Sequence, residues 1–546
     1  MYILGLSSPF SCNTGAALIK DGQLIAMAEE ERFIRIKHAP NALPINSLFF
    51  CLEKAKIKMK DIDMVAMGTM SLLNGYTKSF IEVLLNHDLK RFLKDNYMFG
   101  GYFAHMVLLD RNLKKLGFDL FKNIRYVPHH VCHAVSAFYP SPFDEALVVT
   151  LDGRGENDSA FVGVGRGYEL KRIKKVSSYN SLGLLYGQVT EMLGYRKHSE
   201  EGKIMALSAF GNSRKDIEDI FGHIQNGKYY INKDYEQKIG KIIKNKNYSL
   251  MKEGLLIASS LQSFVEKAAV ELITASYEET KIGRLCLAGG VTLNCKMNQK
   301  LLNLPFIKDI FIQPAAYDSG TALGAALWVY SQKTQKRPPF KMENACWGPE
   351  YTRKEILESI KSAKVNFSKL KNPGRTAAKL LKEGKFIGWF YGRSEIGPRA
   401  LGARSILAHP GLNTTKDKLN KEIKHREPYR PFALSILEEK AEEYFENYYP
   451  SPFMTLTFNV KKNKIKNIKA AVHVDNTVRV QSVSKRTNPV FWSLIKEFEN
   501  LTGIPALLNT SFNDREPIVE SPRDAIRTFF STGLDVLILE DFILEK

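Results

Sequence analysis

The sequence predicts an α/β protein of two domains, the first of which repeats a unit made of a β-hairpin followed by helices. Three observations lead to this prediction. Strand patterns alternate with helical patterns, the hairpin pattern recurs, and a polar, proline-containing segment interrupts the chain near residue 340. A chain of 546 residues is also too long for one hydrophobic core. We therefore expect domains at residues 1–340 and 341–546.

The hairpin pattern begins at the N-terminus. YILGLSS and GAALIK are typical of buried strands, and Asp21-Gly22 is a strong turn signal before QLIAMAEE. The unit recurs at EALVVTLDGRGENDSAFVGVG, where Asp152-Gly153 is the predicted turn after the strand. A strand and turn at 284–294 and a strand, loop and helix at 307–330 follow. Duplicated halves of this kind indicate an actin-like ATPase architecture, whose glycine turns let backbone N–H groups approach phosphates.

The second domain begins after a change in composition. Residues 331–350 (SQKTQKRPPFKMENACWGPE) are polar and hold three prolines, so the boundary is placed there. Beyond it, strands such as KFIGWF and IPALLNT alternate with helical spans such as KDKLNKEIKH. This alternation predicts a second α/β domain.

The composition excludes some classes of protein and leaves others open. No apolar run is long enough to cross a membrane, and MYILGLSSPF has no signal-peptide pattern. Six cysteines without CxxC spacing fit a reducing compartment, so we expect a cytoplasmic protein. A net charge of +20 is compatible with anionic substrates, nucleic acid or an acidic membrane surface. The lysine-rich stretches 239–248 and 461–469 fit a solvated surface better than a nucleic-acid patch.

PHHVCHA (128–134) holds the first candidate site. Pro128 and Pro140 mark the start and end of a predicted helix, so His129 and His133 lie on one face of it. Two imidazoles at this spacing can bind one metal ion, although buried histidines without a metal are the commoner outcome of the spacing. His130 points elsewhere and has no predicted role.

Two aspartates strengthen the case for a metal. Asp152 and Asp318 are both predicted at the ends of elements, where sites are built on α/β folds. Two histidines with two carboxylates suit iron, manganese or zinc. Taken singly, Asp152 is typical of a hairpin turn and Asp318 of a helix N-cap.

The second domain has arginines among glycines and prolines. Planar guanidinium groups held in such loops suit a phosphate or an oxyanion, and we favour this reading over ordinary surface charge. They lie in GRSEIGPRALGARS, KHREPYRPF, HVDNTVRVQ and LNTSFNDREP, and with the lysine among them they are Arg393, Arg399, Arg404, Lys424, Arg426, Arg430, Arg479 and Arg515.

These runs, together with EEERF, LDGRGE, EGKIMALSAFG, LAGGVTLNC and QPAAYDSGTALGAAL, resemble the O-carbamoyltransferase family, which includes nodulation-factor and antibiotic carbamoyltransferases. The resemblance spans nearly the whole chain, and GPRALG and HREPYRPF are its most specific parts. It implies an actin-like N-terminal domain that transfers a carbamoyl group and a C-terminal α/β domain that forms carbamoyl adenylate. Carbamoyl phosphate and ATP, with Mg²⁺, would give carbamoyl adenylate and pyrophosphate. The carbamoyl group would then pass to a hydroxyl of a sugar or natural product, with release of AMP.

The resemblance also implies roles for particular residues. Fe(II), or another divalent metal, would be held by His129, His133, Asp152 and Asp318. Carbamoyl phosphate and the adenylate would be bound by Arg399, Lys424, Arg430, Arg479, Asn509 and Ser511. In the transfer site, the nucleotide would be approached by Gly289, Gly290 and Asn294.

The chain departs from the family in its first hairpin loop. The family usually has a His-Asp pair where this chain has Cys12-Asn13. Lys37 and His38 match the family's Lys-His pair and are the nearest catalytic replacements. For Cys12 we expect a small buried thiol rather than a nucleophile.

Two alternative functions remain open. The net charge is compatible with an enzyme that makes threonylcarbamoyl-adenosine in tRNA, but the C-terminal motifs weigh against it, and a nucleic-acid partner is disfavoured. A non-catalytic, nucleotide-gated binding protein would have no need of the C-terminal arginines. Neither the acceptor nor the oligomeric state can be derived from the sequence, although long helices within residues 70–120 would fit a homodimer.

Overall fold

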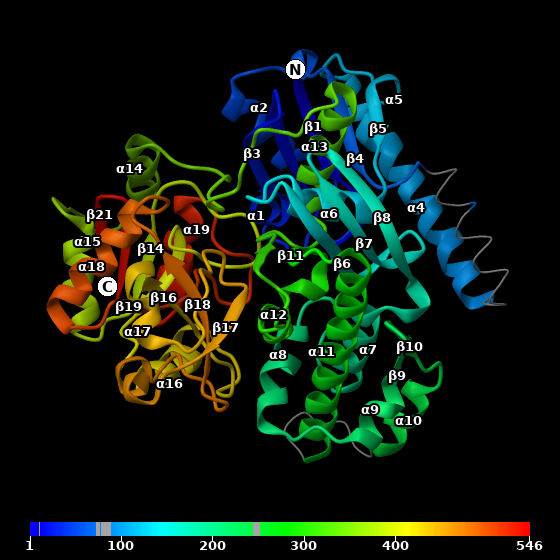
Figure 1. The fold of residues 1–546 in the computed structure, drawn as a ribbon. Helices are drawn as coiled ribbons and strands as arrows, with labels where there is room; N and C mark the ends of the chain where they lie inside the picture. Colours follow the sequence, from blue (N-terminus) through cyan, green and yellow to red (C-terminus); the bar gives the residue numbers. More distant parts are fainter. Residues whose placement is uncertain (10, 72–76, 78–88, 244–251) are drawn as a thin grey trace. The chain divides into compact units, whose positions relative to one another are not determined.

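The computed structural model describes residues 1–9, 11–71, 77, 89–243 and 252–546. The chain forms two compact units, Met1–Met342 and Glu343–Lys546 (Figure 1). The stretches 70–120 and 239–248, to which the sequence assigned long helices that would fit a homodimer and a charged surface, lie partly outside the described residues.

The first half of the first unit is a five-stranded sheet of order β3-β2-β1-β4-β5. The first three strands are antiparallel, and β4 and β5 extend the sheet in parallel. Its strands are β1 (Tyr2–Ser7), β2 (Gly15–Lys20), β3 (Gln23–Glu29), β4 (Met64–Gly68) and β5 (Ile124–Tyr126). Asp21 and Gly22 join β2 to β3 with φ values of 50° and 79°. Positive φ at both positions is typical of the tight hairpin turn that the sequence predicted, so this hairpin is confirmed.

The second half repeats the arrangement in a sheet of order β12-β11-β6-β7-β8. Here β6, β7 and β8 are antiparallel, and β11 and β12 extend the sheet in parallel. Its strands are β6 (Glu145–Gly155), β7 (Asp158–Arg166), β8 (Glu169–Ser177), β11 (Arg284–Ala288) and β12 (Asp309–Ile312). One strand order used twice confirms the predicted actin-like α/β fold.

The predicted turn at Asp152-Gly153 is wrong. Both residues lie inside β6, where the register against β7 shifts between Leu151 and Gly155. The chain reverses only afterwards, next to Glu156, whose φ is 53°. A bulge of this kind lets the strand continue while it re-aims a side chain, here that of Asp152.

Two helices each pack against the sheet of the other half. α6 (His129–Phe138) follows the first sheet but packs against β6, β7 and β11 of the second. α13 (Gly320–Thr334) follows the second sheet but packs against β1, β2 and β4 of the first. The two helices also pack against each other in the middle of the unit (Figure 1). This exchange brings α6 and the loop before α13 close to the bulge of β6.

Gly324 of α13 permits the close approach of these two helices. A Cβ at this position would lie 1.9 Å from the carbonyl oxygen of Cys132 in α6. Overpacking of a tight contact costs about 1–3 kcal/mol, so Gly324→Ala is expected to lower the free energy of unfolding by about that amount. Urea-induced unfolding measures the difference.

Gly240→Ala in α10 (Tyr235–Ile242) is the matched control, because a Cβ there meets no atom of the described residues within 4 Å. Alanine is the better helix former, so this variant should be as stable as the wild type or more so. Equal stabilities of the two variants would contradict the tight contact between α6 and α13.

The remaining helices of the first unit surround its sheets, and a short hairpin accompanies them. α2 and α4 contribute to the hydrophobic core beneath the first sheet. Along the first half they are α1 (Glu30–Ile34), α2 (Ile45–Ala55), α4 (Leu89–Lys114) and α5 (Leu120–Asn123). Along the second half they are α7 (Leu182–Met192), α8 (Glu201–Leu207), α9 (Lys215–Phe221), β9 (Gly222–Gln225), β10 (Lys228–Ile231), α11 (Lys252–Thr280) and α12 (Cys295–Leu302).

The second unit is a nine-stranded mixed sheet with helices on both faces, which agrees with the predicted α/β class of this part of the chain. In spatial order its strands are β13 (Ser368–Lys369), β21 (Phe542–Glu545), β20 (Val536–Leu539), β14 (Ile387–Phe390), β15 (Arg404–Ala408), β19 (Ala506–Ser511), β16 (Ala433–Leu437), β18 (Thr477–Val483) and β17 (Leu456–Asn459). One face is covered by α14 (Arg353–Ser362) and α19 (Pro522–Ser531), and the other by α15 (Pro373–Lys382) and α18 (Pro489–Thr502). Two short helices, α16 (Thr415–Lys418) and α17 (Ala441–Tyr444), lie in its loops.

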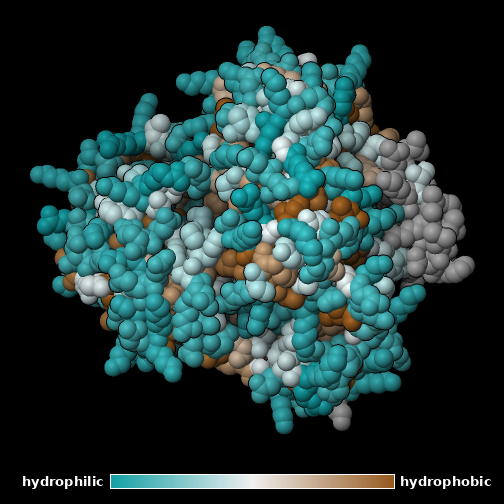
Figure 2. Space-filling model, viewed as in Figure 1, coloured by the Kyte–Doolittle hydropathy of each residue, from teal (hydrophilic) through white to brown (hydrophobic). Residues whose placement is uncertain are grey.

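The surface is largely polar. The face seen in Figure 2 is covered mostly by hydrophilic residues, as expected for a chain that is 25% charged. Among the helices of the described ranges, none is both long and apolar enough to cross a membrane.

Candidate metal centre and anion-binding site

His129 and His133 face each other one turn apart at the start of α6. The helix begins at His129 immediately after Pro128, and both side chains are buried. Their Nε2 atoms are 3.0 Å apart. Two imidazole lone pairs at that distance repel each other unless a proton or a metal cation lies between them.

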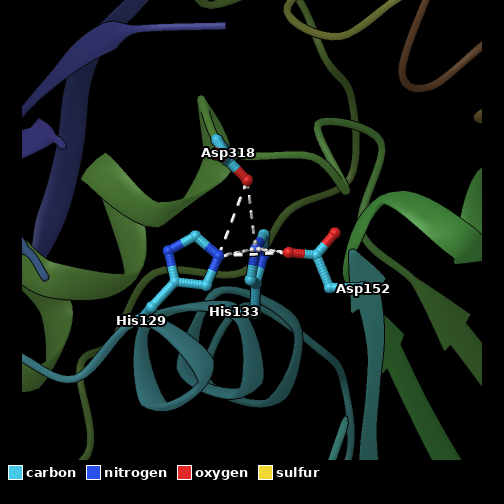
Figure 3. A group of neighbouring side chains, drawn as sticks. All are labelled: His129, His133, Asp152 and Asp318. Atoms are coloured by element: carbon cyan, nitrogen blue, oxygen red, sulfur yellow. Dashed lines mark hydrogen bonds and ion pairs between the residues drawn. The ribbon is translucent and has the colours of Figure 1, made fainter. Parts of the chain in front are cut away.

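Two aspartates complete the group (Figure 3). Asp152 Oδ2 lies 3.1 Å from Nε2 of His129 and 3.6 Å from Nε2 of His133. Asp318 Oδ1 lies 3.6 Å and 3.7 Å from the same two atoms. One ligand atom from each of the four residues lies within 4.8 Å of all the others. His129 and His133 therefore lie on one face of the helix, and Asp152 and Asp318 lie beside them, as the sequence predicted.

Asp318 does not cap a helix, so this part of the prediction is wrong. α13 begins at Gly320, its N-cap is Ser319, and no side chain caps it. The carboxylate of Asp318 is instead turned toward the histidines (Figure 3).

The charges within the group are strongly coupled. Burial lowers the pKa of His129, but the neighbouring carboxylates of Asp318 and Asp152 more than offset this and raise it to about 10. The pKa of His133 is also raised, because its contacts with Asp152 and Asp318 outweigh burial. Burial raises the pKa of Asp152, but contacts with both histidines bring it well below its usual value. Two carboxylates thus favour positive charge at one point, where a divalent cation can replace the imidazole protons.

Surrounding atoms hold these ligands in place. The N–H of Gly290 donates to Oδ1 of Asp152 at 2.9 Å, which leaves Oδ2 facing the histidines. A Cβ at Gly155 would lie 2.4 Å from the ring of His129. Oriented donors of both nitrogen and oxygen type fit a divalent transition metal.

His130 is not part of this group and makes hydrogen bonds to neighbouring strands instead. Its Nδ1 bonds Oγ1 of Thr150 at 2.7 Å, and its Nε2 bonds the carbonyl oxygen of Asp158 at 2.9 Å. Burial lowers the pKa of His130 to about 3, with His129 adding to the effect. A neutral imidazole bonded at both nitrogens ties α6 to β6 and β7.

The predicted nucleotide-binding residues make protein contacts. Gly289 N–H donates to Ala316 O at 2.8 Å, and Gly290 N–H is bound to Asp152. Asn294 accepts from the N–H of Met297 at the start of α12. Gly290 thus orients Asp152 of the metal group, by which we mean His129, His133, Asp152 and Asp318, and Asn294 caps α12. Contact of these residues with a nucleotide stays a prediction.

His38 lies in a second polar cluster of the first unit. Its Nδ1 is 2.8 Å from Oδ1 of Asn13, and its Nε2 is 3.1 Å from Oγ of Ser199. Burial, followed by the charge of Lys37, lowers the pKa of His38 to about 4, so the imidazole is neutral at neutral pH. The side chain of Lys37 is exposed.

Cys12 is half-buried rather than fully buried as expected. Burial and the charge of Asp318 raise the pKa of its thiol. A protonated thiol fits the expectation that Cys12 is no nucleophile.

The second unit places Asn509 and Arg479 on one face of its sheet. Ala433 of β16 pairs with Asn509 of β19 on one side and with Arg479 of β18 on the other. In-register neighbours point to the same face, so the small side chain of Ala433 leaves room between the two polar ones. The loop that contains Arg399 covers this face, since Ala400 O accepts from Asn509 Nδ2 at 3.1 Å.

Three guanidinium groups converge beside this face. Arg426 is stacked on Phe432, with its Cζ 4.2 Å from the ring centroid. Burial lowers the pKa of Arg426 well below its usual value, and the nearby charges of Arg430 and Arg479 lower it further. Cations gathered this closely favour an anion among them. The sequence included Arg426 among the candidate oxyanion-binding residues, but the resemblance did not place it in the carbamoyl-phosphate site.

Lys424 is also drawn into this region. Its Nζ lies 3.0 Å from the carbonyl oxygen of Ser511 and 2.6 Å from both oxygens of Asn513, main-chain and side-chain. The ammonium is almost fully buried among these neutral acceptors. The structure thus joins Lys424 and Ser511, as predicted, and adds Asn513.

Two of the predicted oxyanion donors donate hydrogen bonds to main-chain carbonyls of the same unit. Arg404 is fully buried, with its Cζ 3.6 Å from the ring centroid of Phe390, and it donates to main-chain carbonyls. Arg393 donates to the carbonyl oxygens of Trp347 and Gly348. The interpretation of Arg404 as an anion-site donor is wrong, because its burial cannot be read from the glycines around it, whereas anion binding by Arg393 stays a prediction.

An actin-like unit with four possible metal ligands and an α/β unit with converging arginines fit a two-domain transferase. The chain belongs to the carbamoyltransferase family: the family's N-terminal domain matches residues 2–327 and its C-terminal domain matches residues 378–546.

Relatives cover most or all of the chain. It is 38% identical to nodulation protein NolNO of Sinorhizobium fredii over all of this chain and 80% of that protein. It is 39% identical to nodulation protein NolO of Bradyrhizobium diazoefficiens over 77% of this chain and 78% of that protein. An uncharacterized protein of Synechocystis is 35% identical over all of this chain and 97% of its own length. Among solved structures, the chain is similar to component A of (R)-2-hydroxyglutaryl-CoA dehydratase from Acidaminococcus fermentans. The alignment covers 61% of this chain and 98% of that chain, with 15% identity and a TM-score of 0.34.

Proposed function

We propose that this carbamoyltransferase is ATP-dependent and works in two steps. The second unit converts carbamoyl phosphate and ATP with Mg²⁺ to carbamoyl adenylate and pyrophosphate. The first unit then transfers the carbamoyl group to a hydroxyl of a sugar or natural product and releases AMP. The free cysteines fit a cytoplasmic setting.

The observation that carries the proposal is that a cluster of arginines lies beside Asn509, whose side-chain oxygen is a buried hydrogen-bond acceptor without a donor in the described part of the chain. Nδ2 of Asn509 donates to Ala400 O, to Ser435 Oγ at 2.8 Å and to Gln481 Oε1 at 3.4 Å. Oδ1 of the same side chain is buried, and no donor from the described part of the chain reaches it. A buried acceptor without a partner is costly, and the amino group of a carbamoyl moiety would satisfy it.

The cations beside Asn509 suit the other end of carbamoyl phosphate. Arg426, Arg430 and Arg479 together can offset the charge that builds up as the phosphate is attacked or expelled. A ligand with an amide at one end and a phosphate at the other therefore matches both halves of the site.

For the second step, the donors that would hold a divalent metal such as Fe(II) are His129, His133, Asp152 and Asp318. When bound, such an ion supplies Lewis-acid polarisation of an oxygen ligand. The neutral imidazole of His38 can take the proton of the acceptor hydroxyl, which is the role of a general base.

Incubation of the protein with ATP, Mg²⁺ and carbamoyl phosphate, with and without Fe(II), tests the first step. Pyrophosphate and carbamoyl adenylate should both form. The absence of both products with each metal would contradict the proposal. Pyrophosphate release that needs threonine and bicarbonate instead of carbamoyl phosphate would favour the tRNA-modifying alternative.

A further inference from the structure

We propose that Asn13, His38 and Ser199 form a proton relay for the acceptor hydroxyl, in which Ser199 passes the proton on and Asn13 orients the imidazole. This inference rests on the proposed function, because it describes how carbamoyl transfer would remove a proton.

The three side chains come from loops far apart in the sequence and meet in one chain of hydrogen bonds. Asn13 Oδ1 is 2.8 Å from His38 Nδ1, and Ser199 Oγ is 3.1 Å from His38 Nε2. The two distances are those of good hydrogen bonds. Both nitrogens of the imidazole are thereby engaged, one by an amide oxygen and the other by a hydroxyl.

The backbone is built to keep the first two residues together. Asn13 and His38 have φ values of 62° and 66°, in the left-handed region that non-glycine residues seldom adopt. The N–H of Asn13 donates to the carbonyl oxygen of His38 at 2.6 Å. A carboxylate oxygen of Glu31 accepts from the N–H of His38. Two residues held in an uncommon conformation by several contacts are a feature of functional sites.

Asn13 decides which nitrogen of His38 carries the hydrogen. An amide oxygen can only accept, so Nδ1 of His38 must donate and Nε2 must keep its lone pair. That lone pair accepts the hydroxyl hydrogen of Ser199. The oxygen of Ser199 is then free to accept a hydrogen from another hydroxyl, and the direction of proton transfer is fixed.

The relay lies close to the metal group. Glu29 accepts hydrogen bonds from Tyr317 and Ser319, the residues on either side of Asp318. The charge of Glu29 also acts on His38. Cys12, next to Asn13, is near enough to Asp318 for that carboxylate to raise its thiol pKa. The three relay residues are all only partly buried, so a substrate hydroxyl can reach them.

The chemical step balances as follows. The acceptor oxygen forms a bond to the carbamoyl carbon, and the bond from that carbon to the AMP phosphate breaks, with its electron pair leaving on AMP. The acceptor proton moves to Ser199 Oγ while the hydroxyl proton of Ser199 moves to His38 Nε2. His38 becomes an imidazolium, and it returns its proton to solvent after AMP leaves.

Methanol serves as the probe acceptor, because the natural acceptor is unidentified and methanol is the smallest hydroxyl compound that gives a stable product, methyl carbamate. The wild type is supplied with ATP, Mg²⁺, Fe(II) and carbamoyl phosphate. Ser199→Ala and Asn13→Ala should each lower methyl carbamate formation by at least about 10²-fold, the usual contribution of general base catalysis. Neither should change pyrophosphate release.

Two further variants separate a relay from a structural role. Ser199→Thr keeps the hydroxyl and should recover most of the transfer rate. Ser11→Ala is the matched control, because the Ser11 hydroxyl lies in the same loop but bonds only the carbonyl of Ser8 among described contacts. It should behave as the wild type.

The state of His38 is measured independently by NMR of the full-length protein with ¹⁵N-labelled histidine. Wild-type His38 should carry its hydrogen on Nδ1, and Asn13→Ala should lose this preference. Asn13→Asp should raise the pKa of His38 above its value of about 4, because a carboxylate stabilises the imidazolium, and the pH at which transfer falls off should rise with it. The charged and titratable groups that already face His38 are Glu29, Glu31, Lys37, Arg196 and His198.

The outcomes distinguish the relay from the proposed function. Wild-type transfer rates in Ser199→Ala, or hydrogen on Nε2 of wild-type His38, would overturn the relay even if methyl carbamate forms. Failure of the wild type to form carbamoyl adenylate would overturn the proposed function, while the NMR result still decides the orientation of His38.

Discussion

Arg430→Ala is expected to slow carbamoyl-adenylate formation by about 10²–10³-fold, the usual cost of removing one donor from a site that stabilises developing negative charge. Arg430 belongs to the cluster with Arg426 and Arg479. Its side chain is 32% exposed, and its only ion pair with a described residue is a long one with Glu427, at 3.9 Å. The fold should therefore tolerate its loss. Initial rates of pyrophosphate release measure the effect, and thermal unfolding checks the stability.

Two variants sharpen this experiment. Arg430→Lys keeps the charge but loses the planar fork, so its rate should fall between those of the wild type and Arg430→Ala. Arg486→Ala removes an exposed arginine of the same unit that pairs with Glu343, and it should leave the rate unchanged. A wild-type rate in Arg430→Ala would show that the arginine cluster is not where carbamoyl phosphate reacts.

Local chemistry explains which parts of the fold could be predicted. Asp21-Gly22 forms the predicted turn because both residues adopt positive φ between two strands that pair at once. The same dipeptide at Asp152-Gly153 forms no turn, because the pairing of β6 with β7 resumes beyond it at Gly155 and Asp158. Turn propensity is a local property, whereas the length of a strand is decided by its partner. The sequence could therefore predict the hairpin but not its end.

The same distinction applies to the metal group. The four-residue spacing of His129 and His133 is a property of one helix, so the sequence could place both on one face. Their meeting with Asp152 and Asp318 depends on the exchange of α6 and α13 between the two halves, over separations that no local pattern encodes. The bulge in β6 and the uncapped start of α13 aim the two carboxylates, and neither was predicted.

Contacts between loops were the least predictable. In the sequence, Cys12-Asn13 replaced the His-Asp pair expected from the family, and His38 was named with Lys37 as the nearest catalytic replacement. In the fold, Asn13 touches His38, because two residues with positive φ bring their loops together. Nor could composition separate Arg404, which is buried, from Arg430, which is partly exposed, although both stand beside glycine or proline.

His133→Ala is expected to abolish metal binding and carbamoyl transfer while carbamoyl-adenylate formation continues at the wild-type rate. His133 is fully buried, and its Nε2 lies 3.0 Å from Nε2 of His129, 3.6 Å from Oδ2 of Asp152 and 3.7 Å from Oδ1 of Asp318. Its loss leaves two carboxylates facing a single imidazole across an enlarged cavity. Loss of a residue that only hydrogen-bonds a metal ligand lowers metal affinity by about 10–100-fold. Loss of the ligand His133 itself should lower the affinity for Fe(II) by more. Metal content after equilibration with Fe(II), methyl carbamate formation and pyrophosphate release are measured on the same preparation.

His130→Gln is the matched control for this variant, because His130 is a buried histidine of the same helix that bonds Thr150 and the carbonyl of Asp158 instead of the metal group. A general loss of packing in α6 would impair both variants, whereas loss of a ligand impairs only His133→Ala. The arginines proposed to act in adenylation lie in a unit with its own hydrophobic core, so damage to α6 should not reach them. If His133→Ala lost carbamoyl-adenylate formation while His130→Gln kept it, the assignment of the two steps to separate units would be wrong. The buried group would then have to act in the activation of carbamoyl phosphate rather than in its delivery.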